Sequence, residues 1–234
     1  MFSGLWSISS LVVVMTLLAA AYYIYERRGV STREAALIAS LAALAGLSRV
    51  PFGGFPGIQP TTFMVIISGA VFGPGAGFMV GSLSAVVSNM ILGQGPWTPW
   101  QMLAWGLAGL FGGLLRRFTV ANIESEEDIA GEDYEEGEPK RRDLFQFSKT
   151  GKAVFIVSAF FWGFIFGWFM NTWHWLTFVY PHTWQTFFLT HLSSAWFDVL
   201  HAVSNAVFMA VAGGEMIKIL NRFQRRLHFK TKVY

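Results

Sequence analysis

The chain contains two long stretches that are almost free of ionised side chains. Between Ala35 and Leu115 the only charged residue is Arg49, and between Ala153 and Gly214 the only one is Asp198. Hydrophobic residues make up 53% of the chain and charged residues only 13%, about half the charge of an average soluble domain. The mean hydropathy is +0.46. These features predict an all-α fold, a polytopic membrane helix bundle.

Charges, prolines and glycines divide the apolar sequence into seven candidate membrane spans. They are residues 8–25, 33–48, 61–72, 76–92, 99–115, 153–172 and 194–219. The predicted organisation is an N-terminal transmembrane helix with a cytoplasmic turn (1–30), the first part of the bundle (31–118), an acidic cytoplasmic linker (119–152), the second part of the bundle (153–220) and a basic cytoplasmic tail (221–234).

The basic residues predict the orientation of these spans, because Lys and Arg in short loops stay on the cytoplasmic side. With seven spans, three groups of basic residues fall on one side: Arg27, Arg28 and Arg33; Arg116, Arg117, Lys149 and Lys152; Lys218, Arg222, Arg225 and Arg226. We therefore expect a multi-pass protein of the cell membrane with its N-terminus outside and its C-terminus in the cytoplasm. Six tryptophans near the outer face could form an interfacial belt: Trp97, Trp100, Trp173, Trp175, Trp184 and Trp196.

The linker differs from the rest of the chain because ten of the fourteen acidic residues lie between Glu124 and Asp143. It offers too little apolar surface to repay its ordering entropy, and its carboxylates have no regular ligand spacing. We assign it no chemistry. The chain has no cysteine, which excludes disulfides and Cys metal sites.

Two loops on the predicted outer face favour small-molecule binding. The segments RVPFGGFPGIQPTTF, from Arg49, and LGQGPWTPWQMLAWG, from Leu92, are rich in Gly, Pro, Gln, Thr and Trp and hold almost no charge. Such loops combine rigid backbone, aromatic faces and neutral hydrogen-bonding groups. We expect a largely neutral ligand with a broad, flat part.

Polar residues inside the spans add further candidates. Ser194, Asp198, His201 and Asn205 follow spacings of 4, 3 and 4, so they form one stripe that must face protein or water. Gly163, Gly167 and Asn171 form a small-residue face in span 153–172, and Gly81, Ala85, Ser88 and Asn89 form one in span 76–92. For the glycines the favoured interpretation is helix packing. For Asn89, Asn171 and Asp198, binding and packing both remain open.

The two isolated charges, Arg49 and Asp198, invite pairing, because a buried pair avoids the cost of either charge alone. The alternative is that Arg49 snorkels to lipid phosphates while Asp198 caps its helix.

The chain lacks the local signatures of several enzyme classes. There is no GxxxxGK[ST], HExxH or GxSxG motif. The glycines of FGPGAG, at residues 72–77, are better explained by a tight turn and close helix contact than by nucleotide binding. His174, His182 and His191 lie in a Trp-rich segment without carboxylates, so we expect hydrogen bonding, with no metal and no cofactor.

Residues 33–117, and more weakly 153–226, resemble the substrate-binding S component of an energy-coupling factor (ECF) vitamin transporter. The similarity rests on the AxxxA spacing of Ala35, Ala39 and Ala43, the RxP sequence from Arg49, the turn ISGAVFGPGAGFMVG and the segment SNMILGQGPWTPWQMLAWGLAG. The last segment most closely resembles cobalamin-type S components. The extra N-terminal span and the acidic linker are not part of the six-helix core of that family.

The resemblance implies a non-enzymatic subunit that captures a vitamin, most of all cobalamin, at the outer face. It also implies partners: a transmembrane coupling subunit, contacted through Ala35, Ala39 and Ala43, and two cytoplasmic ATPase subunits, besides the lipid bilayer. No nucleic acid is expected. Packing within the monomer is the alternative role of the AxxxA face.

The candidate substrate-binding residues are Arg49, Phe55, Gln59, Thr62, Asn89, Gln94, Trp97, Trp100, Gln101, Trp105, Asn171, His174, Asp198, His201 and Asn205. Three alternatives stay open. The ligand could be another vitamin such as riboflavin, the protein could be an intramembrane enzyme using Asp198 and His201 as an acid/base pair, or it could be a structural membrane subunit.

Overall fold

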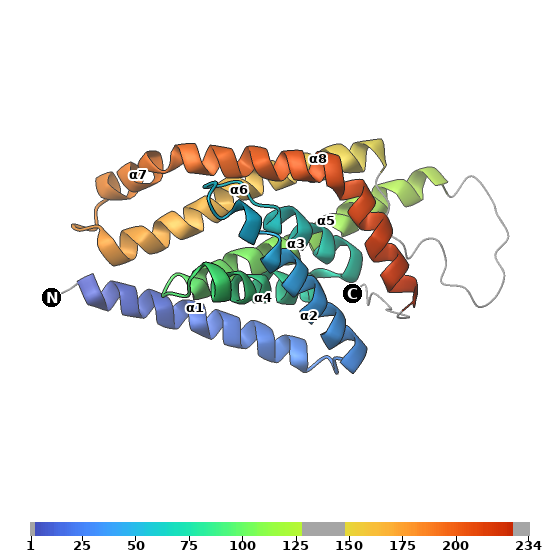
Figure 1. The fold of residues 1–234 in the computed structure, drawn as a ribbon, viewed down its shortest axis with the longest axis horizontal. Coiled ribbons are helices and arrows are strands. Elements are labelled where there is room, and N and C mark those ends of the chain that lie inside the picture. The colour runs from blue at the N-terminus through green and yellow to red at the C-terminus, as the bar shows by residue number, and fades with distance from the viewer. Residues whose placement is uncertain (1–2, 128–147, 227–234) are drawn as a thin grey trace.

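The computed structural model describes residues 3–127 and 148–226, and every regular element in these ranges is helical (Figure 1). The elements are α1 (Ser3–Glu26), α2 (Thr32–Leu47), the short 3-10 helix η1 (Val50–Phe52), α3 (Thr61–Phe72), α4 (Pro74–Leu92), α5 (Thr98–Glu127), α6 (Lys149–Phe178), α7 (Trp184–Ser193) and α8 (Ala195–Arg226). The predicted all-α membrane bundle is confirmed. Most of the acidic linker and the end of the basic tail lie outside the described residues.

Each of the seven predicted spans lies largely within one helix. Among the described residues, five helices are long and apolar enough to cross a membrane: α1, α2 together with η1, α4, α6 and α8. The other two spans correspond to α3, with 12 residues, and to α5. At 1.5 Å per residue α3 is about 18 Å long, shorter than the hydrocarbon core of a bilayer.

Residues 173–193 separate the last two predicted spans and were not predicted to be helical, but most of them are. Helix α6 continues to Phe178, and α7 begins at Trp184. Thr183 stabilises this start because its hydroxyl accepts a hydrogen bond from the Thr186 amide, while the Thr186 side chain accepts one from the Thr183 amide. The capping box was not recognised in the sequence because Thr replaces the usual Glu or Gln at its third helical position.

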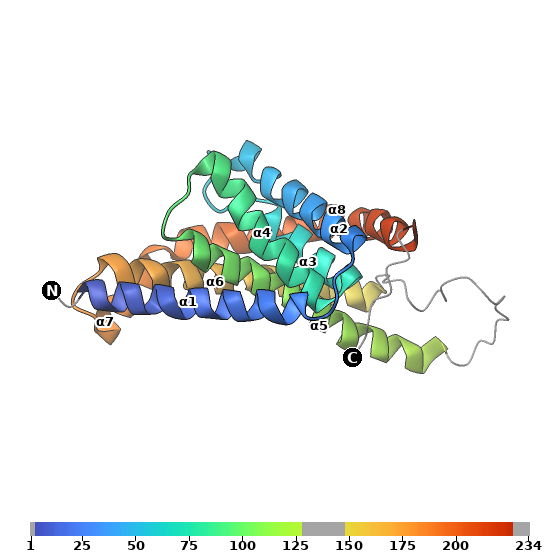
Figure 2. The ribbon, with the colours of Figure 1, turned by 90° about the horizontal axis from the view of Figure 1, so that it is seen from below.

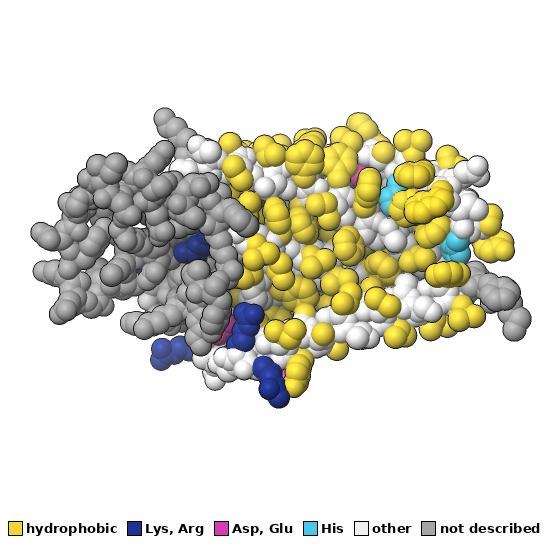
Figure 3. Space-filling view, turned by 180° about the vertical axis from the view of Figure 1, so that it is seen from behind, with side chains coloured by type: hydrophobic (Ala, Val, Ile, Leu, Met, Phe, Trp, Pro, Cys, Tyr) yellow, Lys and Arg dark blue, Asp and Glu magenta, His cyan; other side chains and the backbone are white. Residues whose placement is uncertain are grey.

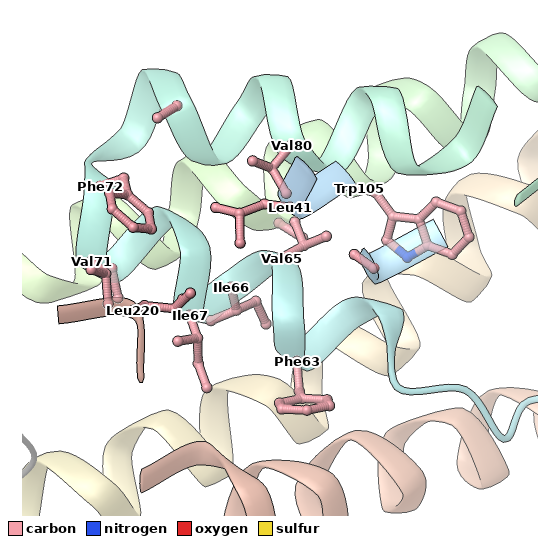
Figure 4. Close-up of a cluster of buried hydrophobic side chains, with 14 of the residues drawn as sticks. Leu41, Phe63, Val65, Ile66, Ile67, Val71, Phe72, Val80, Trp105 and Leu220 are labelled. Atoms are coloured by element: carbon pink, nitrogen blue, oxygen red, sulfur yellow. The ribbon is translucent and has the colours of Figure 1, made fainter. Parts of the chain in front are cut away.

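The core is centred on α3, which is surrounded by other helices (Figure 4). Val65, Ile66 and Ile67 are fully buried, and 11 of the 12 residues of α3 are buried. This explains why a short helix can be apolar on all sides. A methyl group at Gly69 would lie 1.8 Å from the carbonyl oxygen of Gly109, so glycine is what lets α3 and α5 touch.

Helix α1 lies at the edge of the bundle, beside α5 and α6 (Figures 1 and 2). Val14 and Leu18 pack with Trp100 and Leu103, and the Tyr22 hydroxyl hydrogen-bonds the Ser82 hydroxyl across 3.0 Å. Most other apolar side chains of α1 are exposed, as expected for a helix that faces lipid.

The two ends of the bundle differ in chemistry. The N-terminal end of α1 lies beside the last turns of α6: Ser7 hydrogen-bonds Thr177, and Trp6 contacts His182. At the opposite end lie the last turns of α5 and α8 and the start of α6 (Figure 1). In Figure 3 the Lys and Arg side chains gather toward that end and the histidines toward the other, with an apolar surface between them. The segments predicted to share a membrane face therefore do lie together.

Candidate functional site

Arg49 follows the last turn of α2 and points into the bundle. Its Nη1 donates hydrogen bonds to Ser88 Oγ at 3.3 Å and to Asn89 Oδ1 at 3.1 Å. Its guanidinium carbon lies 5.4 Å from the centre of the Trp105 ring, within the range of a cation–π contact. The snorkelling alternative is therefore wrong, because the guanidinium is held by groups inside the protein.

Asn89, near the end of α4, connects Arg49 to the first turn of α5. Its Nδ2 donates to Thr98 Oγ1 at 2.9 Å and to Gln101 Oε1 at 2.7 Å. The Thr98 hydroxyl donates in turn to Gln94 Oε1 at 3.0 Å. Asn89, Thr98 and Gln101 are all buried, so this network fixes their side chains where the two helices meet.

A second chain of hydrogen bonds runs from α5 through α3 to α8. The indole Nε1 of Trp105 donates to Thr62 Oγ1 at 3.1 Å, and the Thr62 hydroxyl also bonds His201 Nε2 at 3.0 Å. Phe166 of α6 stacks on Trp105 with ring centres 4.9 Å apart and contacts the His201 ring edge-on. Because Trp105 also faces Arg49, the two networks form one polar cluster, which we call the Arg49 cluster. Its members are Arg49, Thr62, Ser88, Asn89, Gln94, Thr98, Gln101, Trp105 and His201.

The loop that follows Arg49 is fastened to α8. The Ser204 hydroxyl donates to the Gly57 carbonyl at 3.2 Å, and the backbone N–H of Gln59 donates to the Ser204 hydroxyl at 3.4 Å. Gly57 has a φ of +78°, and a methyl group there would lie 2.8 Å from the Phe197 carbonyl oxygen. Only glycine suits both constraints. Gln59 thus contributes through its backbone, whereas the Phe55 side chain is 61% exposed.

Asp198 and Asn171 form a separate pair between α8 and α6. Asn171 Nδ2 donates to Asp198 Oδ2 at 3.1 Å. Asp198 lies within the first turn of α8, after Ser194, and so is not the capping residue. Arg49 and Asp198 have different hydrogen-bond partners, and among the described residues no ion pair joins them.

The side chains of the remaining predicted site residues do not take part in the hydrogen bonds of the Arg49 cluster. Trp97 contacts the Trp173 ring with centres 5.9 Å apart. Trp100 faces α1 and lines an apolar cleft of about 1010 Å³ between α1 and the helices α4, α5 and α6. His174 is exposed and contacts Phe178. Asn205 is fully buried one turn beyond His201, and neither amide atom has a hydrogen-bond partner within the described part of the chain.

The predicted list omitted Ser88, Thr98, Phe166 and Ser204. Ser88 precedes Asn89 on a face already recognised as polar, and Thr98 lies in the aromatic loop, so both could have been included. Phe166 carried no signal, because an aromatic residue in a membrane span is equally compatible with a lipid-facing position.

The Arg49 cluster offers one cation, several neutral donors and acceptors, and two aromatic rings. Its polar atoms are directed at one another without a paired acid and base: His201 bonds Thr62, while Asp198 bonds Asn171. Across residues 3–127 and 148–226, no three His, Cys, Asp or Glu side chains gather in a way that could hold a metal ion. Fold and site thus define a polytopic helical membrane protein with a polar cluster among α2, α3, α4, α5 and α8.

Comparison with known proteins gives this class a family context. Residues 29–130 match the family model of the ECF-type riboflavin transporter, S component. This match supports the ECF S-component class for the chain. It does not distinguish a cobalamin type, and it argues against the enzyme alternative because the family consists of transporter components.

Similar proteins carry less specific names. A UPF0397 protein of Aliivibrio fischeri (strain MJ11) is 29% identical over 142 residues, which cover 58% of this chain and 66% of that protein. A UPF0397 protein of Vibrio atlanticus (strain LGP32) is 29% identical over 102 residues, or 42% of this chain and 56% of that protein. The matches thus span no more than about two thirds of these relatives. No solved structure matches the chain.

Proposed function

We propose that this protein is the membrane-embedded substrate-binding subunit of an ECF-type vitamin importer. The observation that carries the proposal is the Arg49 cluster, a group of mostly buried polar side chains in a largely apolar bundle. All of its members except His201 lie within the segment that matches the S-component family. Buried polar networks are costly in a membrane protein unless they are satisfied, and they commonly mark substrate sites.

The cluster is closed in this structure, because Asn89, Thr62, Trp105 and His201 are each less than 5% exposed. A bound ligand would replace the hydrogen bond between Asn89 and Gln101 with bonds of its own to these side chains. The buried polar groups of the protein would then keep hydrogen-bond partners, so binding would carry little desolvation cost. We infer that a ligand would enter past the loop from Gly93 to Trp97, which follows α4 directly. Gly93 has a φ of +112° and no neighbour within 4 Å of where its side chain would be.

Cobalamin remains the first candidate ligand, because SNMILGQGPWTPWQMLAWGLAG resembles cobalamin-type S components. Riboflavin is the second candidate, favoured by the description of the matching family. Both have a flat ring system that Trp105 and Phe166 could contact, and both carry amide or imide groups that the side chains of Asn89 and Gln101 could bind.

The coupling partners of the proposal are a transmembrane subunit and two ATPase subunits. The AxxxA face of α2 supports contact with the transmembrane subunit, because Ala35 and Ala39 are exposed and Ala43 is half-buried. The core face of the same helix uses other residues, among them Leu37, Leu41 and Ala45.

Two experiments test the binding function. Mass spectrometry of small molecules that co-purify with the gently solubilised protein should find a vitamin. Calorimetry of ligand-free protein against cobalamin and riboflavin should then show tight binding of one of them. Arg49→Gln should weaken that binding at least tenfold, since it removes the charge that orders Asn89.

The matched control is Glu215→Gln, which alters an exposed residue at the opposite end of the bundle and should bind normally. If the folded protein binds no vitamin, or if Arg49→Gln and Glu215→Gln bind equally well, the assignment is wrong.

A further inference from the structure

A basic cleft lies at the end of the bundle opposite the Arg49 cluster, where α6 begins and α8 ends. It has a volume of about 480 Å³ and is lined by the four cationic side chains Lys152, Lys218, Arg222 and Arg225, together with Gly214 and Ile217. Within residues 3–127 and 148–226, the only acidic side chain that forms an ion pair with these cations is Glu215, which pairs with Lys218 at 2.8 Å. The cleft therefore carries an excess of positive charge.

The shape of α8 creates this cleft. Figure 1 shows that the helix changes direction in its second half, the half that contains the adjacent glycines Gly213 and Gly214. Adjacent glycines are a common cause of such bends, because they weaken the helix locally. A methyl group at Gly214 would have no neighbour within 4 Å, so the space beside it is open.

The surface around the cleft is rich in exposed apolar side chains. Exposed apolar side chains follow α8 over its whole length: Val199, Val203, Val207, Val211, Ile219 and Phe223. Ile219 and Phe223, 50% and 48% exposed, lie between and beside the cations at positions 218, 222 and 225. Alternation of exposed apolar and basic side chains is typical of a helix segment at the boundary between acyl chains and headgroups.

A second positive contribution comes from the start of α6. Helix α6 begins at Lys149, and Ser148 caps it by accepting a hydrogen bond from the Gly151 amide at 2.9 Å. The helix dipole therefore adds partial positive charge next to Lys152. The cleft thus joins cations from two helices, α6 and α8.

We propose that this cleft binds the headgroup of an anionic phospholipid in the membrane leaflet on its side. The lipid phosphate would lie among Lys152, Arg222 and Arg225, and its acyl chains would pass over Ile219 and Phe223. Basic clefts between transmembrane helices favour such headgroups because each cation near the surface adds to the attraction. This site is independent of the proposed vitamin site.

The test measures lipid binding by the full-length protein in nanodiscs or by native mass spectrometry. Bound phosphatidylglycerol should exceed phosphatidylcholine when both are offered equally. The triple variant Lys152→Gln, Arg222→Gln and Arg225→Gln should reduce this preference by roughly tenfold or more. The matched control is the triple variant Arg27→Gln, Arg28→Gln and Arg33→Gln, which removes three exposed cations outside the cleft and should retain most of the preference.

Inorganic phosphate is offered as a competitor to separate a lipid site from a site for a free anion. Millimolar phosphate should leave phosphatidylglycerol bound; displacement at that concentration would overturn the lipid assignment. Equal retention of the two lipids by the wild-type protein, or equal losses in the two triple variants, would also overturn it. Thermal unfolding temperatures within a few degrees of wild type establish that the variants are folded.

Discussion

Gly167 of α6 leaves the space that the carboxylate of Asp198 occupies on α8. A methyl group at position 167 would lie 2.1 Å from Asp198 Oδ1, closer than any real contact. One turn away, Asn171 donates its hydrogen bond to the other carboxylate oxygen. The small-residue face of α6 and the polar stripe of α8 are therefore two sides of one interface.

This relationship predicts that Gly167→Ala destabilises the bundle by about 1–3 kcal/mol, because the new methyl group forces apart α6 and the Asp198 side chain. Thermal unfolding in detergent should show a clearly lower midpoint. Gly214→Ala is the control, since it also adds one methyl group to a helical glycine but meets no neighbour within 4 Å. Equal midpoints for the two variants would contradict the packing argument.

Trp100 and Gln101 are neighbours in sequence that serve different surfaces. Gln101→Ala should weaken vitamin binding about tenfold, because it leaves Asn89 Nδ2 with one fewer acceptor in the Arg49 cluster. Trp100→Ala should leave the affinity for the vitamin nearly unchanged. It should lower the free energy of unfolding by about 3 kcal/mol, because it removes the ring that packs against α1. Calorimetry and thermal unfolding of both variants check this division, and a larger affinity loss for Trp100→Ala would refute it.

Ala39 lies on the exposed face of α2 and is predicted to contact the coupling subunit. Ala39→Leu should block co-purification with that subunit while vitamin binding stays intact, because a larger side chain prevents close helix approach. Ala19→Leu, on the exposed surface of α1, serves as the control. Normal vitamin uptake by cells that express Ala39→Leu at the wild-type level would reject the role of this face.

Orientation in the membrane can be tested with single cysteines, because the chain has none. Gln185→Cys, exposed on α7, should react in intact cells with a thiol reagent that does not cross membranes, and Glu26→Cys should not. The expectation follows from the Lys and Arg residues that cluster at the end of the bundle near Glu26. The reverse labelling pattern would invert the protein and place the proposed vitamin site on the cytoplasmic side.

Hydropathy and charge were sufficient to predict the helical class and the positions of seven helices, because apolar segments in a bilayer must satisfy their own backbone hydrogen bonds. The bounds were less accurate, since α5 continues to Glu127, within the predicted linker, and α6 to Phe178. The polar stripe of α8 could also be recognised: Asp198, His201 and Asn205 are all buried, as their spacing requires. These properties depend on local composition and helical periodicity, both of which are present in the sequence.

Only the tertiary structure decided which polar groups meet. Arg49 could have paired with Asp198 or reached lipid, and its actual partners, Ser88 and Asn89, depend on how α2 crosses α4. Trp100 and Gln101 differ in role because they differ by about 100° around α5 and face different neighbours. The sequence sets the period of each helix, but the packing of helices against one another sets which face meets which partner.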